Sequence, residues 1–297
     1  MIEIKELKKS FSGFPALDGL NLTVPTGSVY GLVGPNGAGK TTAIKHLTGV
    51  YRQDSGEVLL DGEPVFENPK AKEKLAYIPD EIYYFPQAGI RDMAEFYRGV
   101  YPKFSEERYR KLGEAFGLDE KAPIKRFSRG MQKQAAFRLA MSLMPEVLVL
   151  DEPVDGLDPV MRRQIWTLLL ADVAERGMTV LVSSHNLREL EDVCDHVGII
   201  HAGKTLVERS LSELQDNMVK VQLVLPEGAA LPEGLNVLHE SRVGQVRTLI
   251  LRGRTEEISA VVAAAGPLFY DLLPLTLEEI FIYELGGEHY AVRDVLL

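Results

Sequence analysis

The segment at residues 34–41, GPNGAGKT, has the residue types and the spacing of a phosphate-binding loop. It fits the pattern GxxxxGK[ST], whose glycines let backbone N–H groups turn toward phosphate oxygens. The ammonium of Lys40 can reach the terminal phosphates of a nucleoside triphosphate, and the hydroxyl of Thr41 can hold Mg²⁺. The expected nucleotide-binding residues are Gly34, Pro35, Asn36, Gly37, Ala38, Gly39, Lys40, Thr41 and Thr42.

An acidic pair, Asp151 and Glu152, follows the apolar run VLVL at residues 147–150. An acid at the C-terminal end of a buried strand lies beside the phosphate-binding loop in open α/β sheets. We therefore predict that Asp151 serves Mg²⁺. Glu152 is one residue further along the chain, so it points elsewhere, toward an attacking water. A carboxylate in the position of a general base contributes about 10²–10⁴-fold to a rate.

Secondary-structure elements must hold these groups together. The apolar run VYGLV at residues 29–33 precedes the phosphate loop, and a helical pattern follows it. Residues 90–143 are predicted to be mostly helical. Further strands are expected at residues 2–4, 75–78, 147–150, 179–184 and 197–200, and residues 57–65 are expected to form a hairpin around Asp61 and Gly62. This alternation predicts an α/β fold of the P-loop type, with a mostly parallel sheet, an antiparallel β part at the N-terminus and a helical insertion.

The sequence pattern changes after about residue 217. The segment VKVQLVL at residues 219–225 alternates as a strand does, and a loop rich in Pro, Gly and Glu follows. We expect a nucleotide-binding domain at residues 1–217, with a helical subdomain at about 85–145. A small α+β domain at residues 218–297 is expected to contribute a dimer contact or a regulatory element.

Composition limits the partners and the compartment. The net charge of −10 argues against broad binding to nucleic acid. The longest apolar stretch, at residues 260–269, is shorter than the roughly 20 residues that a membrane span needs. Any role at a membrane is therefore expected to go through a partner. Cys194 is the sole cysteine, so a disulfide within the chain is impossible and a reducing compartment is expected.

Five motifs together resemble those of the ATP-binding cassette (ABC) ATPases. They occur in the order typical of that family: GPNGAGKTT, FSRGMQ, VLVLDEP, DGLD and SSHN. The resemblance covers roughly residues 1–217. It implies that Glu152 is the catalytic base, that His185 contacts the γ-phosphate of ATP, and that Phe11 stacks on adenine.

The family also works as a dimer. Two subunits enclose two ATP molecules, and the signature motif of one subunit completes the site of the other. The resemblance therefore implies that Ser128, Arg129 and Gly130 act on the ATP of a partner subunit. It also implies that Asp158 lies in a loop at the dimer interface.

Some of these roles have alternatives. Phe11 could belong to the core, and Phe14 is a competing aromatic residue for adenine. His185 could be a polar strand end. Aromatic residues are frequent at residues 83–104, a segment that receives the coupling helix of the permease in the family. We expect most of them inside a helical core, at residues 84, 96, 97 and 101, with Tyr83 and Tyr84 favoured for partner contact.

Two departures from the family pattern are present. Asp80 stands where the family usually has Gln; its carboxylate can still coordinate Mg²⁺, but it adds negative charge near the phosphates. The signature is usually LSGGQ, whereas here Arg129 replaces a glycine and Met131 replaces the glutamine. Arg129 could contact phosphate or lie in solvent, and Gln132 is one position too late to replace the lost side chain directly.

The segments PDE and SRGM, with the later LTLEEIF, resemble ATP-binding subunits of ABC-2-type exporters, including the YtrB-like group. This resemblance implies a cytoplasmic protein, peripheral on the inner face of the cell membrane. Its partners would be a membrane permease and a second ATPase subunit, identical or different, with no nucleic acid.

The alternative is a soluble ABC-type ATPase acting in assembly, translation or on nucleic acid. A single cassette, without a long heptad tract between Lys40 and Asp151, disfavours the translation and chromosome-maintenance types. A GTPase or nucleotide kinase would leave DGLD and His185 unexplained, and the chain has no NKxD motif.

Overall fold

The computed structural model describes residues 1–285 except 186, 217 and 227. Contacts divide the chain into two compact units, which we call unit 1 (Met1–Asn186 and Val193–Glu208) and unit 2 (Leu187–Asp192 and Arg209 onward). Unit 2 thus takes in residues 187–192 and 209–217, which lie inside the nucleotide-binding domain expected from the sequence. Residues 286–297 of the expected C-terminal domain lie outside the described residues.

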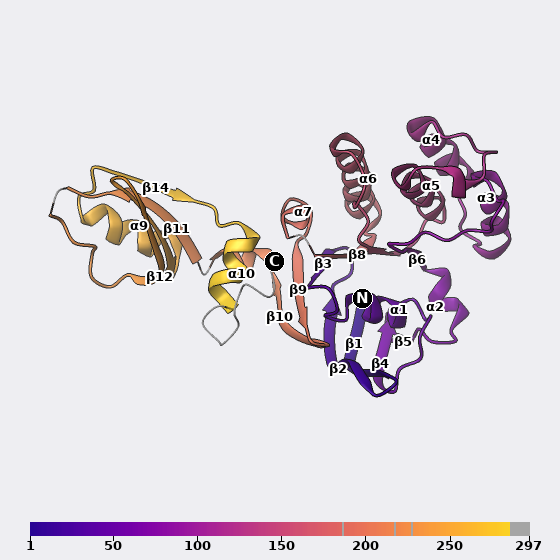
Figure 1. Ribbon diagram of the computed structural model, residues 1–297, viewed down its shortest axis with the longest axis horizontal. Coiled ribbons are helices and arrows are strands. Elements are labelled where there is room, and N and C mark those ends of the chain that lie inside the picture. Colours follow the sequence, from indigo (N-terminus) through magenta and orange to yellow (C-terminus); the bar gives the residue numbers. More distant parts are fainter. Residues whose placement is uncertain (186, 217, 227, 286–297) are drawn as a thin grey trace. The chain divides into compact units, whose positions relative to one another are not determined.

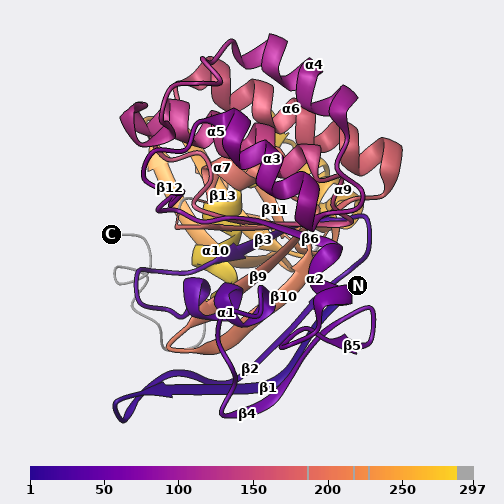
Figure 2. The same cartoon turned by 90° about the vertical axis from the view of Figure 1, so that its right-hand side faces the viewer.

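An antiparallel sheet opens unit 1 (Figures 1 and 2). Its strand order is β2-β1-β4-β5, built from β1 (Ile2–Phe11), β2 (Phe14–Val24), β4 (Ser55–Leu60) and β5 (Glu63–Pro64). Asp61 and Gly62 join β4 to β5 with φ values of 51° and 80°. Positive φ at both central residues is what a tight two-residue hairpin requires, and the Asp-Gly pair supplies it.

A six-stranded sheet forms the centre of unit 1, in the order β10-β9-β3-β8-β7-β6. Its strands are β3 (Val29–Val33), β6 (Leu75–Ile78), β7 (Val147–Asp151), β8 (Thr179–Ser184), β9 (His196–His201) and β10 (Lys204–Ser210). β3 pairs in parallel with β8 and β9, and β7 pairs in parallel with β6 and β8. The carboxyl ends of β3, β8 and β7 therefore lie side by side, and residues 34, 185 and 152 follow those ends.

Helices cover this sheet. α1 (Lys40–Leu47) contacts β2, β4 and β7, so it packs between the two sheets. α6 (Pro159–Arg176) packs on β8, and α5 (Arg129–Ser142) packs on β6. The remaining helices are α2 (Pro69–Glu73), α3 (Ile90–Val100), α4 (Glu106–Phe116) and the 3₁₀ turn η1 (Ile124–Arg126). These helices confirm the predicted P-loop fold with its helical insertion.

The helical insertion has its own core, and the structure corrects one expectation for the aromatic residues. Tyr84 packs against this core, as does Tyr97, so Tyr84 is partly buried, as a core residue was expected to be. Phe96 was expected inside but is 48% exposed, because it stands on the outer side of α3. Tyr83 is 83% exposed, as a partner contact requires.

Unit 2 is a small α+β assembly. Its antiparallel sheet has the order β12-β13-β11-β14, from β11 (Met218–Val224), β12 (Asn236–Val243), β13 (Val246–Arg252) and β14 (Phe269–Leu273). α9 (Thr255–Ala264) packs on β11 and β14, and α10 (Leu277–Leu285) packs on α7 (Arg188–Glu191). α8 (Leu211–Asp216) lies beside β11. In the described part of the chain, no helix is both long and apolar enough to cross a membrane.

A buried carboxylate joins the helical insertion to α6. Asp172 is 2% exposed and accepts hydrogen bonds from Arg108 of α4 at 2.6 Å and from Arg176 at 2.8 Å. Arg176 also donates to the carbonyl of Pro145 at 3.2 Å. A buried anion of this kind is tolerable because two cations satisfy both of its oxygens.

We expect Asp172→Ala to lower the free energy of unfolding of unit 1 by about 3 kcal/mol, because it leaves two arginines without their anion. Urea unfolding can be followed by the fluorescence of Trp166, the single tryptophan, which is buried on the same helix. Glu107→Ala is the control, because it removes the same charge from an exposed pair with Lys111. Equal shifts of the two unfolding midpoints would contradict this assignment.

Candidate functional site

The loop between β3 and α1 depends on its glycines. A Cβ on Gly34 would lie 2.3 Å from the carbonyl oxygen of Ile200, which is too close for any side chain. Gly37 and Gly39 have φ values of 83° and 110°, which side chains disfavour. α1 begins without a side-chain cap, because Gly39 has none to offer. The first N–H groups of α1 have no partner within the helix, so they can bind an anion.

The side chain of Lys40 folds back over this loop. Its Nζ donates to the carbonyl oxygen of Gly34 at 2.6 Å and lies 3.7 Å from Oε1 of Glu152. Burial lowers the pKa of Lys40, and the charges of Glu152 and Asp151 oppose that shift. The structure thus places a desolvated ammonium at the phosphate loop and pairs it with the expected base.

Glu152 is held in an unusual conformation. Its φ is 46°, in the left-handed region that side chains disfavour by roughly 1–3 kcal/mol. Its N–H donates to the carbonyl oxygen of Ser183 at 3.1 Å, and its Oε2 lies 3.0 Å from Nδ1 of His185. Burial raises the pKa of Glu152, while His185 and Lys40 lower it and Asp155 raises it. The carboxylate therefore lies between two basic groups, as a general base oriented by its neighbours does.

Asp151 and Asp80 stand at the ends of neighbouring strands. Asp151 is 1% exposed, and its Oδ1 accepts a hydrogen bond from the hydroxyl of Ser183, its register partner on β8. Asp80 follows β6, and its side chain is 55% exposed. The pKa of Tyr77 is raised by burial and by the charges of both Asp151 and Asp80. These two carboxylates thus act on the same edge of the sheet.

The signature segment begins α5. Ser128 caps the helix, with its hydroxyl accepting from the N–H of Met131 at 3.3 Å. A Cβ on Gly130 would lie 3.3 Å from the carbonyl oxygen of Gly156, a tight contact, so glycine lets the helix start lie close to that loop without displacing it. The side-chain amide of Gln132 donates to the carbonyl of Phe127 at 2.9 Å. Gln132 is therefore engaged locally and does not stand in for the glutamine of the usual signature.

Arg129 is exposed and lines a groove of about 520 Å³. The other groove residues are Asp80, Glu81, Ile82, Gln132, Lys133, Asp155 and Gly156. The guanidinium thus faces a region with several carboxylates.

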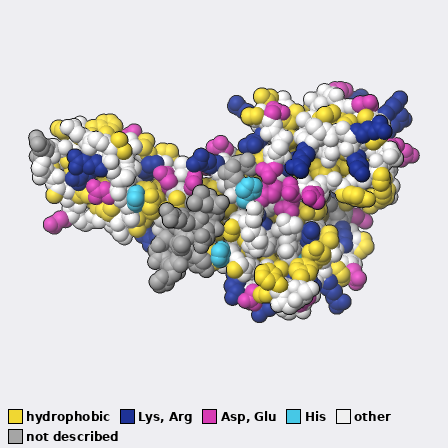
Figure 3. Space-filling view, viewed as in Figure 1, with side chains coloured by type: hydrophobic (Ala, Val, Ile, Leu, Met, Phe, Trp, Pro, Cys, Tyr) yellow, Lys and Arg dark blue, Asp and Glu magenta, His cyan; other side chains and the backbone are white. Residues whose placement is uncertain are grey.

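Acidic side chains gather beside a histidine where β8 and α6 lie (Figure 3). Side-chain ligand atoms of Glu152, Asp155 and His185 lie within 4.8 Å of one another. Asp158 is nearby in sequence and caps α6, its Oδ1 accepting from the N–H groups of Val160 and Met161 at 3.0 Å each. The carboxylate of Asp158 therefore stabilises the first turn of α6, which follows the DGLD segment.

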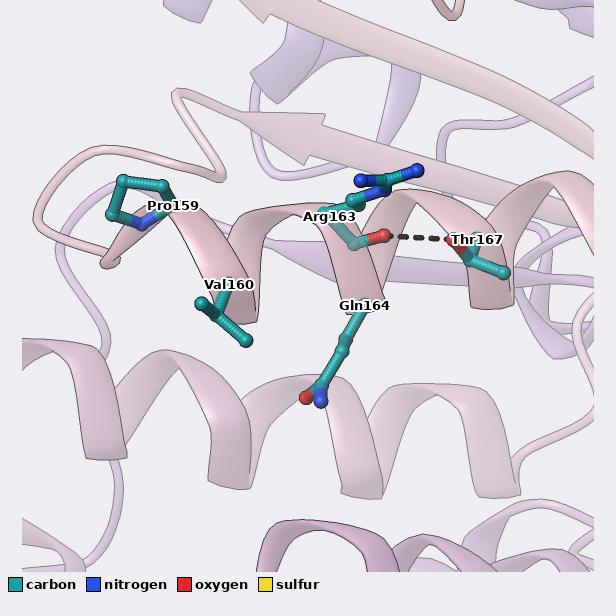
Figure 4. Close-up of a pocket in the computed structure, with 5 residues that line it drawn as sticks. All are labelled: Pro159, Val160, Arg163, Gln164 and Thr167. Atoms are coloured by element: carbon teal, nitrogen blue, oxygen red, sulfur yellow. Dashed lines mark hydrogen bonds between the residues drawn. The ribbon is translucent and has the colours of Figure 1, made fainter.

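A second hollow lies on the outer side of α6, directly after Asp158 (Figure 4). It has a volume of about 650 Å³ and is lined by Pro159, Val160, Arg163, Gln164 and Thr167. The hydroxyl of Thr167 donates to the carbonyl of Arg163 at 2.9 Å, within the helix itself. Val160 is 68% exposed, so this face of α6 presents an apolar side chain to solvent.

Both aromatic candidates for adenine lie at the β1–β2 hairpin. Phe11 is 40% exposed and meets Tyr51 edge-on, with ring centroids 5.3 Å apart, so it is not a core residue. Lys9 stands 5.6 Å from the centre of the Phe11 ring. Phe14 is 70% exposed and pairs with Phe11 across the hairpin. Phe11 thus has an aromatic neighbour in Tyr51 and is the less exposed of the two candidate rings.

Three functional contacts were not foreseen from the sequence. The hydroxyl of Ser183 bonds Asp151, the ammonium of Lys133 donates to the carbonyl of Glu152 at 2.5 Å, and Asp155 joins the group around His185. The register of two buried strands could have suggested Ser183. Nothing in the local pattern of α5 distinguishes Lys133 from a solvated lysine.

Comparisons with known proteins place the chain among the ATP-binding proteins of ABC transporters. A family model described as ABC transporter matches residues 17–155. The chain is 29% identical over 289 residues to the ABC transporter ATP-binding protein YtrB of Bacillus subtilis, covering 97% of this chain and 99% of that protein. It is 31% identical over 297 residues to the Nod factor export ATP-binding protein I of Burkholderia lata, covering 97% of each. A solved structure titled as the ATP binding subunit of an ABC transporter is 26% identical, with a TM-score of 0.67 over 72% of this chain and 92% of that one.

Asp155 gives a direct test of the electrostatics around Glu152. Asp155→Asn removes a negative charge that disfavours the ionised form of Glu152, so the pKa of that carboxyl should fall toward its ordinary value. Carbon-13 NMR of side-chain-labelled glutamate can follow the titration, with Glu152→Gln identifying the resonance. Glu114→Gln on α4 is the control, because it changes the net charge equally at an exposed site. An unchanged or raised pKa in Asp155→Asn would show that the two carboxylates do not interact.

Proposed function

Because this chain belongs to the ATP-binding proteins of ABC transporters and hydrolyses ATP, we propose that it powers a separate membrane permease through ATP-driven closure of a dimer. The observation that carries the hydrolytic part is the row of groups Lys40, Glu152 and His185, joined at 3.7 Å and 3.0 Å. These contacts bring a phosphate-binding cation, a base and a histidine together beyond the carboxyl ends of β3, β7 and β8.

In the proposed reaction, Glu152 accepts a proton from the attacking water as the water oxygen bonds to the γ-phosphorus of ATP. The bond between the γ-phosphorus and the oxygen that bridges it to the β-phosphate breaks, so ADP and inorganic phosphate are the products. The Lys40 ammonium and the N–H groups at the start of α1 bind the phosphate oxygens on which charge accumulates. His185 orients the carboxylate through its Nδ1 contact and lies beside the position of the γ-phosphate. Phe11 stacks on adenine, with Tyr51 supporting it from behind.

The oxygen ligands at the sheet edge fit Mg²⁺. Thr41 lies in the first turn of α1, and Asp151 and Asp80 lie at the ends of neighbouring strands. The hydroxyl oxygen of Thr41 and the carboxylate oxygens of the two aspartates are hard ligands of the kind Mg²⁺ prefers. The Ser183 hydroxyl orients Asp151 by bonding one of its oxygens. When bound, Mg²⁺ neutralises charge on the ATP phosphates.

Dimer closure is proposed from the signature segment and the DGLD loop. Ser128 and Gly130 present a hydroxyl and backbone N–H groups at the start of α5, and Arg129 adds an exposed positive charge. Such a helix start can bind the phosphates of ATP held by a partner subunit. The loop with Asp158 and the adjoining face of α6 with Val160 would contribute to the same interface. Unit 2 would add a dimer contact or a regulatory element.

The permease contact is proposed at the exposed aromatic residues after Asp80. Tyr83, Phe85 and Phe96 are 83%, 57% and 48% exposed, and the rings of Phe85 and Phe96 meet edge-on at 5.7 Å. An apolar cluster on the helical insertion suits a coupling helix of a membrane protein. Export is the proposed direction, in keeping with the resemblance to ABC-2-type exporters and with the Nod factor export relative. The chain would then lie on the cytoplasmic face of the membrane.

Glu152→Gln tests the hydrolytic proposal. It keeps the size of the side chain but removes the base, so hydrolysis should fall at least about 100-fold, while ATP still binds and drives dimer formation. Hydrolysis is measured by phosphate release, ATP binding by a fluorescent ATP analogue, and dimer formation by light scattering with and without ATP. Lys40→Ala is the comparison variant, which should lose ATP affinity and dimer formation together. Hydrolysis at the wild-type rate in Glu152→Gln would exclude the base assignment.

Membrane fractionation tests the transport proposal. The chain should sediment with membranes only when its permease is co-expressed, and Tyr83→Ser with Phe85→Ser should abolish most of that association by removing the apolar contact. Phe14→Ser is the control, because it removes an exposed aromatic residue from the distant hairpin. A chain that remains in the supernatant beside its permease and co-purifies with nucleic acid would instead favour the soluble ABC-type ATPase.

A further inference from the structure

The buried ammonium of Lys133 is a feature that the proposed reaction does not use. Lys133 lies on α5, just past the signature segment, and is 4% exposed. Burying a lysine is costly unless hydrogen bonds and opposite charges compensate for the lost water. The groups that bind its ammonium therefore indicate the function of this side chain.

The first partner is the backbone of Glu152. Nζ of Lys133 donates to the carbonyl oxygen of Glu152 at 2.5 Å. On the other side of the same residue, the N–H of Glu152 donates to Ser183 of β8. The peptide groups before and after Glu152 are thus both held, one by a neighbouring strand and the other by α5.

The second partner is Asp80, whose Oδ1 lies 3.8 Å from Nζ of Lys133. Asp80 stands where the resembled family usually has a glutamine. A carboxylate gives the buried ammonium an opposite charge, which a glutamine amide would not. The carboxylate is more than half exposed, so this pair is weaker than the contact with the carbonyl of Glu152.

The backbone conformation of Glu152 explains why such a brace is needed. A φ of 46° is unfavourable for glutamate and persists only where surrounding contacts impose it. This conformation directs the side chain so that its two oxygens reach His185 and Lys40. With the carbonyl released, Glu152 would relax toward negative φ and its carboxylate would turn away from both groups.

We propose that Lys133 is a positioning residue for hydrolysis, whose ammonium holds the carbonyl of Glu152 and thereby aims its carboxylate. Asp80 acts on the same ammonium, so the loop after β6 and the start of α5 both influence Glu152 through one side chain. This inference rests on the proposed role of Glu152 as the base.

The test compares Lys133→Met, which keeps an unbranched apolar stem and loses the ammonium, with Lys133→Arg in the full chain. A misplaced base costs about 10–100-fold, so kcat for ATP hydrolysis should fall by that factor in Lys133→Met, while the Kd for ATP stays within about 2-fold because the phosphate loop is untouched. Lys133→Arg should recover most of kcat. Lys103→Met is the control, because Lys103 is an exposed lysine paired with Glu146 outside the site, and its kcat should not change.

A double-mutant cycle tests the part played by Asp80. If Asp80 acts through Lys133 as well as at the metal, the fall in kcat that Asp80→Asn causes should be clearly smaller in Lys133→Met than in the wild-type background. Equal effects of Asp80→Asn in both backgrounds would overturn this part and leave Asp80 with an independent role at the metal.

A wild-type kcat in Lys133→Met, beside an inactive Glu152→Gln, would overturn the inference alone. Hydrolysis by Glu152→Gln would overturn the base assignment and the inference with it. A parallel loss of kcat, ATP affinity and thermal stability without recovery in Lys133→Arg would show a merely structural lysine. Should Lys133→Met fail to fold, Lys133→Gln, which keeps an N–H donor without the charge, is measured in its place against the same criteria.

Discussion

The parallel pairing of β3, β8 and β7 is the constraint on which the rest of unit 1 depends. These strands are buried along their whole length, and their carboxyl ends lie side by side. The phosphate loop follows β3, His185 follows β8 and Glu152 follows β7. Because ligands bind beyond the carboxyl ends of parallel strands, groups far apart in the sequence meet around one nucleotide.

Burial changes the pKa values of the charged groups that lie together at the ends of these strands. Burial lowers the pKa of Lys40 and raises that of Glu152, and each group opposes the shift of the other. An ammonium and a carboxylate with little water around them interact more strongly than they would in solvent. The site thus holds an ammonium and a carboxylate close together, and groups fixed in place in this way reduce the reorganisation that a reaction requires.

The helical insertion is tied to this centre at several points rather than attached at its ends alone. Asp172 joins α4 to α6, Gly130 lets the start of α5 approach Gly156, and Lys133 reaches the backbone of Glu152. The signature segment and Glu152 therefore belong to one packed body.

The sequence by itself determined the groups whose chemistry is local. The glycines, Lys40 and Thr41 of the expected phosphate loop lie within eight consecutive residues, and the alternation of strands and helices predicted the α/β fold with its helical insertion. Only the tertiary structure decided the contacts between distant segments, such as Ser183 with Asp151, Lys133 with Glu152 and Tyr84 with the helical core. The physical reason is that burial and partners depend on which elements pack together. A lysine such as Lys133, or a tyrosine such as Tyr84, has the same local pattern whether it faces solvent or the interior.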